Sequence, residues 1–124
     1  MARHVTFEDS WIRFVPEIGL SGNREDPEPV AMEIHPISAG EMRALGRRVA
    51  TKLGREPEVV VARRLVEQLL TDRVRAIVNY SVNGGAITTG AELGKNGESE
   101  VIDEVVEALT AASVLDDDVK KKSP

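Results

Sequence analysis

One apolar stripe dominates the middle of the chain and limits what it can fold into. From Pro57 onward, apolar residues recur three or four positions apart at Val59, Ala62, Val66, Leu69, Leu70, Val74 and Ile77. This spacing is typical of one buried face of an α-helix, and proline suits the first turn of a helix. We therefore predict a long helix over 57–78 that ends at Asn79 and forms the spine of the core. The run 59–61 favours a strand locally, but the register of the whole segment is helical.

A second helix is predicted just before this stripe. Ser38 and Glu41 have the spacing of a capping box, in which the hydroxyl accepts from the N3 amide and the carboxylate accepts from the cap amide. Gly54 is well placed to end the helix. Gly46 lies inside it, and a close crossing with another helix would explain a glycine there. The apolar positions are Met42, Leu45, Val49 and Leu53.

Two further helices are predicted towards the C-terminal end. Thr89 and Glu92 match a second capping box, so a short helix is expected there. Asn83-Gly84-Gly85 reads as a turn rather than a phosphate-binding loop. The last helix opens at Glu98 or Ser99, and its apolar positions are Ile102, Val105, Val106, Leu109 and Ala112.

The first third of the chain predicts two strands. Residues 11–15 and 30–35 show the alternation of half-buried strands, and a polar loop over 19–29 joins them. Pro36 closes the second strand. The expected fold is α+β, mainly α: an N-terminal β-hairpin followed by three principal helices and a disordered basic tail. Residues 1–119 would form a single globular domain and residues 120–124 a flexible tail.

Composition excludes several classes of protein. The 124 residues contain no cysteine, which rules out disulfides, thiolate metal sites and cysteine nucleophiles. The longest unbroken apolar run, Val59 to Ala62, is too short to span a membrane. The start of the chain leads into no apolar stretch, so no secretory signal is expected. A cytosolic protein is predicted.

Charge is unevenly distributed along the chain. The net charge is −5, but residues 38–78 carry +4 and residues 79–119 carry −8. Such asymmetry can indicate a nucleic-acid surface, or basic helices that lie beside acidic ones within the fold or between copies. A helix-turn-helix reading would open its recognition helix at Arg55-Glu56-Pro57-Glu58, where two carboxylates would repel phosphate. We favour the second interpretation.

No constellation for catalysis is present. The two histidines, His4 and His35, have no second metal ligand at a suitable spacing. Asp116-Asp117-Asp118 lacks the alternating ligands of a calcium loop. No catalytic, metal-binding or cofactor-binding residue is predicted, and the chain is not expected to be an enzyme.

The overall plan resembles the small tail assembly chaperones of long-tailed bacteriophages. The resemblance runs from a tryptophan-containing strand, through a second strand that ends in Ile37-Ser38-Ala39-Gly40-Glu41, to two helices and an asparagine-bearing loop. In the C-terminal half it rests on three segments: Thr89 to Leu93, Ile102 to Leu109 and Ala112 to Leu115. Lys120-Lys121-Lys122-Ser123 after the last helix is also similar to that family.

The resemblance implies a non-enzymatic chaperone that binds the tape measure protein and keeps it from aggregating while the tail tube polymerises. It implies the tail tube protein and a frameshifted longer form of the chain as further partners, a homo-oligomer, and a location in the host cytoplasm. Lysine codons at 120–122 would suit ribosomal slippage, and a plain solubilising tail is the alternative. The expected contact residues are Trp11 and Phe14 on the hairpin, with Leu109 and Leu115 on the last helix, although all four also suit a core.

Two other functions stay open at this point. The chain could be a structural component of the virion, such as a connector or tail-completion subunit. It could also be a small DNA-binding regulator, whose affinity would fall steeply with salt.

Overall fold

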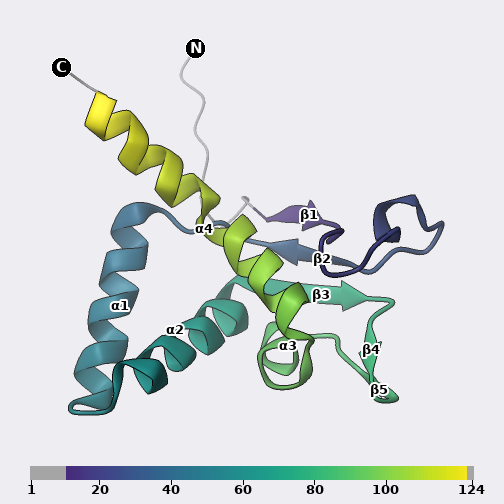
Figure 1. Ribbon diagram of the computed structural model, residues 1–124, viewed down its shortest axis with the longest axis horizontal. Helices are drawn as coiled ribbons and strands as arrows, with labels where there is room; N and C mark the ends of the chain where they lie inside the picture. Colours follow the sequence, from purple (N-terminus) through teal and green to yellow (C-terminus); the bar gives the residue numbers. More distant parts are fainter. Residues whose placement is uncertain (1–10, 123–124) are drawn as a thin grey trace.

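The computed structural model describes the backbone of residues 11–122, and the side chains of the same range except Leu53 and residues 112–122. The elements follow one another in this order (Figure 1): β1 (Ile12–Phe14), the short 3-10 helix η2 (Asn23–Glu25), β2 (Ala31–Ile34), α1 (Ala39–Leu53), α2 (Glu58–Arg73), β3 (Val74–Val78), β4 (Ser81–Val82), β5 (Gly85–Ala86), α3 (Gly90–Asn96) and α4 (Ser99–Lys122). The expected fold class, α+β and mainly α with an N-terminal β-hairpin, is confirmed.

The predicted long helix is shorter than expected, and the chain after it forms a strand. Helix α2 ends at Arg73, and β3 follows without a loop. Strand β3 pairs antiparallel with β2, which also pairs antiparallel with β1, so the sheet has the order β1-β2-β3. The expectation that Val74 and Ile77 continue the helical stripe to Asn79 was therefore wrong.

A β-bulge in β3 explains that error. Ala31 faces Val78 and Glu33 faces Arg75, so β3 has one more residue than β2 between these two pairs. Within the bulge, Ala76 has a φ of 53°. The bulge brings Val74 and Ile77 to the same buried face although they are three residues apart, which is the spacing that a helix would also give.

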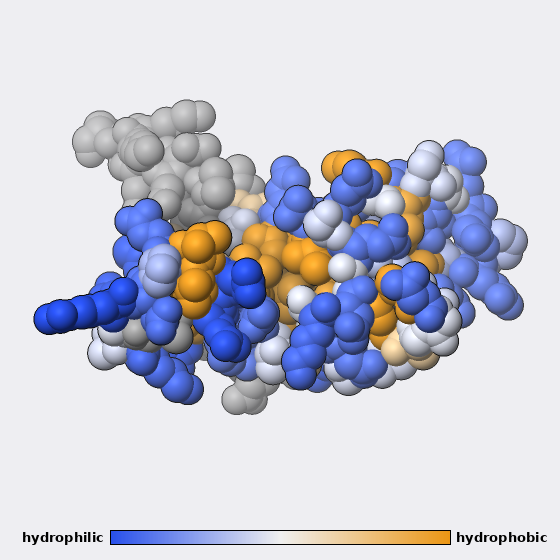
Figure 2. Space-filling view, turned by 60° about the horizontal axis from the view of Figure 1, so that its bottom comes forward, coloured by the Kyte–Doolittle hydropathy of each residue, from blue (hydrophilic) through white to orange (hydrophobic). Residues whose placement is uncertain are grey.

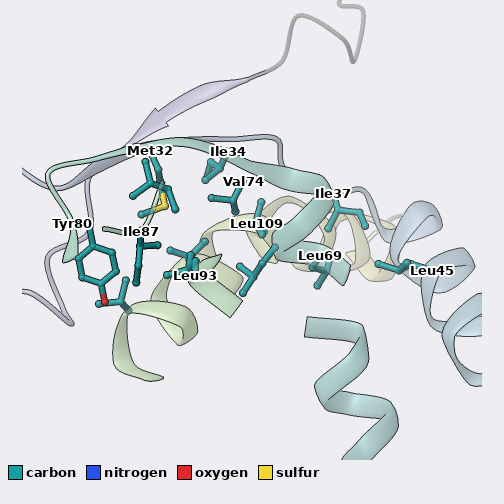
Figure 3. Packing of buried hydrophobic residues seen from close by; sticks show 14 residues of the cluster. Met32, Ile34, Ile37, Leu45, Leu69, Val74, Tyr80, Ile87, Leu93 and Leu109 are labelled. Atoms are coloured by element: carbon teal, nitrogen blue, oxygen red, sulfur yellow. The ribbon is translucent and has the colours of Figure 1, made fainter. Parts of the chain in front are cut away.

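The helices cover one face of the sheet, and the core lies between them. Figure 3 shows side chains from β2, β3 and the helices pointing toward one another there. Leu109 of α4 is fully buried in this cluster. The buried cluster consists of Met32, Ile34, Ile37, Leu45, Leu69, Leu70, Val74, Ile77, Tyr80, Ile87, Leu93, Val101, Val105 and Leu109.

The helix caps agree with the sequence in most details. The Ser38–Glu41 capping box is present, and Gly54 ends α1 with a φ of 63°. Helix α3 begins after Thr89, whose hydroxyl oxygen accepts from the Glu92 amide at 3.2 Å. Glu92 does not complete the box, because its carboxylate instead accepts hydrogen bonds from threonine hydroxyls. The Asn83–Gly84 turn joins β4 to β5 with positive φ at both residues, as a type I′ turn requires.

The loop between β1 and β2 is organised by two polar side chains. The buried Asn23 amide group donates to the carbonyl oxygens of Pro16 and Val30 and accepts from the Val30 amide. From α4, the buried carboxylate of Glu104 accepts from the amides of Glu17 and Gly19, at 2.8 and 3.1 Å. The loop is thus attached both to its own ends and to the last helix.

The closest backbone approach involves a different glycine from the expected one. Nothing lies within 4 Å of the position that a Cβ on Gly46 would take, so the predicted close crossing at Gly46 was wrong. At Gly90, a Cβ would collide with the carbonyl oxygen of Leu70 and lie 2.7 Å from that of Val74. The tight contact is therefore between the start of α3 and the end of α2.

At the C-terminal end, α4 continues to Lys122. Residues 120–122, expected in a flexible tail, therefore belong to the helix, and residues 123 and 124 lie outside the described residues. Among the residues that the structure describes, no helix is both long and apolar enough to cross a membrane.

Candidate partner-binding surface

The face of the sheet opposite the core carries charged and aromatic side chains. The strand register places Arg13 directly opposite Glu33, and Glu33 directly opposite Arg75. Directly opposite residues project from the same face of a sheet, so these three form a row across it. Trp11, just before β1, joins the row through Arg75. We call the surface formed by Trp11, Arg13, Glu33 and Arg75 the Trp11 face.

Trp11 is held at this surface by a guanidinium group. Arg75 Cζ lies 3.9 Å from the centroid of the Trp11 ring, which is the geometry of a cation–π contact. The Nε of Arg75 also donates to Glu33 Oε1 at 3.1 Å. The guanidinium is therefore fixed by a carboxylate and covers part of the indole, while the indole itself is only half-buried.

His35 supports the indole from the strand beneath. The two ring centroids are 5.4 Å apart, and the rings are tilted by 53°. Burial lowers the pKa of His35 below its usual value, and the positive charges of Arg73 and Arg75 lower it further, against the opposing effect of Glu41. The imidazole is therefore neutral at pH 7 and serves as an uncharged platform for Trp11.

The Trp11 face has a surplus of positive charge. Arg75 forms an ion pair with Glu33, whereas Arg13 is exposed and forms none of the three ion pairs found among the described residues. One apolar residue lies exposed at its border: Val78, which pairs with Ala31 on the same face as Glu33 and is 49% accessible. An aromatic ring, an apolar border and an arginine that forms no ion pair with another described residue suit contact with a protein partner, because aromatic residues and arginine are enriched in interfaces.

The four contact residues predicted from the sequence have different positions. Trp11 lies on the Trp11 face, and Phe14, in β1, is half-buried and packs against the core. Leu109 is a core residue with no exposed surface, so its prediction as a contact residue was wrong. The side chain of Leu115 lies outside the described residues. Of the three whose side chains are described, Trp11, Phe14 and Leu109 do not form one exposed patch, because Leu109 is fully buried.

The sequence reasoning missed Arg13 and Arg75. Arg13 alternates with Ile12 and Phe14 in the predicted first strand, and this pattern would have placed it on the opposite face from them. No comparable signal existed for Arg75, because the sequence analysis placed it in a helix. Its position beside Trp11 depends on the pairing of β3 with β2.

The described residues contain no group of three or more His, Asp or Glu side chains that could hold a metal ion. With this geometry established, the chain was compared with known proteins. No protein-family model, no curated protein and no solved structure matches it.

Proposed function

We propose that this chain is a non-enzymatic binding protein, a tail assembly chaperone of a long-tailed bacteriophage, and that the Trp11 face contacts the tape measure protein. The support for the phage context is the resemblance that runs from the tryptophan-containing strand to the last helix. The support for the contact surface is one observation: Trp11 lies half-buried on the outer sheet face, beneath Arg75, rather than in the core.

Tryptophan and arginine are the residue types that most often dominate the binding energy of protein interfaces. A tryptophan already in contact with a guanidinium group and an imidazole ring loses little conformational freedom when a partner binds. The Trp11 face is therefore largely pre-organised for contact.

The chemistry of this surface suggests the kind of segment that it accepts. The indole and the exposed Val78 suit an apolar stripe, and Arg13 suits a carboxylate beside that stripe. An amphipathic helix with acidic residues along one border has both features. The resemblance implies a tape measure protein that is largely helical and exposes apolar stripes, and under this proposal acidic residues border the stripe that is bound. Binding would take place in the cytoplasm of the host.

Co-expression with the tape measure protein tests this proposal. Wild-type chain should keep the tape measure protein in solution and co-purify with it. Trp11→Ala and Arg13→Glu should each reduce co-purification at least tenfold. Arg63→Glu, which makes the same charge change at an exposed position of α2, should co-purify like wild type. Circular dichroism of each variant confirms that it is folded.

The possible outcomes distinguish a failure of the proposed chaperone function from a failure of the Trp11 face as its contact surface. Equal co-purification of all variants would keep the chaperone function but exclude the Trp11 face as the contact. A tape measure protein that stays insoluble with wild-type chain would overturn the function. Detection of the chain in purified virions would then indicate a structural component. The nucleotide sequence over Lys120–Lys122 tests the frameshifted form, because a slippery heptamer must lie there.

A further inference from the structure

A second surface, distant from the Trp11 face, has the features of a docking groove. Helices α1 and α2 diverge from the core as a pair, on the side of the molecule away from β4 and β5 (Figure 1). Between them lies a hollow of about 400 Å³, and a second hollow of about 190 Å³ extends it along α1. Together they are lined by Leu45, Arg48, Val49, Lys52, Arg64, Glu67, Gln68 and Thr71, which we call the α1–α2 groove.

The groove has an apolar floor and a basic rim. Leu45 is buried and Val49 half-buried at its base, while Arg48 and Lys52 are exposed on the α1 side. Figure 2 shows apolar residues between charged ones over this pair of helices. Arg64 is neutralised by Glu67 at 3.3 Å, but no ion pair among the described residues includes Arg48 or Lys52. Within the part of the chain that the structure describes, the rim therefore carries two positive charges outside any ion pair.

The matching surface is on the same chain. Along α4, Glu100, Asp103 and Glu107 are exposed, and none of them forms an ion pair with another described residue. Ile102 and Val106 are half-buried beside this acidic row. The row therefore presents three negative charges, unpaired among the described residues, on a helix with apolar flanks.

The spacing of the charges matches between the two surfaces. Arg48 and Lys52 are four residues apart on α1, and Asp103 and Glu107 are four residues apart on α4. Residues four apart lie about 6 Å from each other on one side of a helix. Two helices that pack side by side can therefore form both pairs at once, at an ordinary interhelical distance of about 8–10 Å.

We infer that the α1–α2 groove of one copy receives the acidic row of α4 from a second copy of this chain. Because the groove and the row are different surfaces, two copies can exchange both contacts in a two-fold dimer, and a contact that is not exchanged continues head-to-tail. A head-to-tail contact produces closed rings or open filaments rather than an isologous dimer. The inference does not depend on the proposed function, because it uses neither the Trp11 face nor the tape measure protein.

Two charge-reversed variants test this inference. Arg48→Glu/Lys52→Glu blocks the groove, and Asp103→Lys/Glu107→Lys blocks the row. Sedimentation velocity from about 10 µM to about 1 mM protein measures association over the range of weak to moderate affinity. Wild-type chain should associate at low salt and dissociate near 0.5 M salt, where screening reaches within about 5 Å. Each variant alone should associate with itself at least tenfold more weakly than wild-type chain does at the same low salt.

An equimolar mixture of the two variants gives the sharpest result. In the mixture, the intact row of one variant meets the intact groove of the other, and the reversed row and the reversed groove also carry opposite charges. The mixture should therefore regain the association that each variant alone loses. As matched controls, Arg55→Glu/Arg63→Glu and Glu25→Lys/Glu28→Lys make the same charge changes at exposed positions outside both surfaces, and they should associate like wild type.

Three outcomes would overturn the inference: a wild-type chain that stays monomeric at about 1 mM and low salt, blocked variants that associate like wild type, or a mixture that does not regain association. Arg48→Gln/Lys52→Gln serves if the reversed groove variant does not fold, because it removes the charges without adding new ones. It should also weaken association.

Discussion

A single alanine occupies the most unusual backbone position in the sheet. Ala76 has a φ of 53°, in the left-handed region, where an L residue with a Cβ is disfavoured by about 1–2 kcal/mol. Asn79 and Asn83 also have positive φ, but asparagine tolerates this conformation through local hydrogen bonds. Ala76 has no such compensation. It persists because the pairs on either side of the bulge fix the backbone between them.

Ala76→Gly should therefore raise the free energy of unfolding by about 0.5–1 kcal/mol, after the extra backbone entropy of glycine is subtracted. Ala76 is exposed, so no packing is lost. Urea denaturation measures the change. Asn83→Gly is the control, and it should change stability by less than about 0.5 kcal/mol. A loss of stability in Ala76→Gly would mean that the methyl group has an unrecognised contact.

His35 gives the fold a dependence on pH. Its pKa in the folded state is lowered from 6.5, mainly by burial. Just below pH 6.5 the unfolded chain therefore binds more protons at this residue than the folded chain does, and stability falls as the pH falls. We expect wild-type chain to lose stability between pH 7.5 and pH 5.5, and His35→Gln to lose less. Urea denaturation at the two pH values measures the free energy of unfolding of both proteins. An equal loss of stability in wild type and His35→Gln would contradict the expectation.

Between elements, the tightest contact is that of α3 against the end of α2. Gly90 has carbonyl oxygens of Leu70 and Val74 where a Cβ would stand. At Gly94, one turn further along α3, the nearest atom is Leu70 Cδ1 at 3.5 Å, which is an ordinary contact distance. The same helix thus has one glycine that the packing requires and one that it does not.

Gly90→Ala should destabilise the protein by at least about 1–3 kcal/mol, because α3 must move away from α2. Gly94→Ala should be neutral or stabilising by up to about 1 kcal/mol, because alanine is the better helix former. Thermal denaturation of the two variants, measured side by side, tests this contrast. Equal effects at both positions would show that α3 adjusts freely on α2.

The elements were predictable where their signals are local. The capping box of α1, the turn between β4 and β5, and the start of α4 each depend on residues within a few positions of one another, and all three are confirmed. Strand β3 was missed because a bulge gives Val74 and Ile77 a helical spacing. The attachment of Glu104 to the loop after β1 was also missed, because its partners are 85 and 87 residues away and no pattern along the chain connects them.

At the scale of the whole molecule, stability is unevenly distributed. The turn between α1 and α2 and the start of α2 are exposed, with 69% of Val59 accessible. Leu69, Val105 and Leu109 are fully buried near the sheet. The far end of the α1–α2 pair therefore has few buried contacts to oppose local unfolding.

Hydrogen exchange should reveal this difference. The amides of Gly54 and Val61, whose hydrogen bonds lie at the far end of the pair, should exchange by local opening. The amides of Leu69 and Val105 should exchange only with global unfolding. Exchange followed by NMR in the native state and in low urea separates the two regimes. Uniform protection across these four amides would show that the pair unfolds together with the core.

The attachment of the first loop to the last helix also has a consequence for synthesis. Strands β1 and β2 leave the ribosome early, but the Glu104 carboxylate and the core side chains Val101, Val105 and Leu109 come much later. At about 5–20 residues per second, several seconds separate the emergence of the hairpin from that of its support. During that interval α1, α2 and α3 are made, but the apolar residues of β2 still lack the side chains that α4 adds to the core. The hairpin and its loop therefore stay incompletely packed until the last helix has been made.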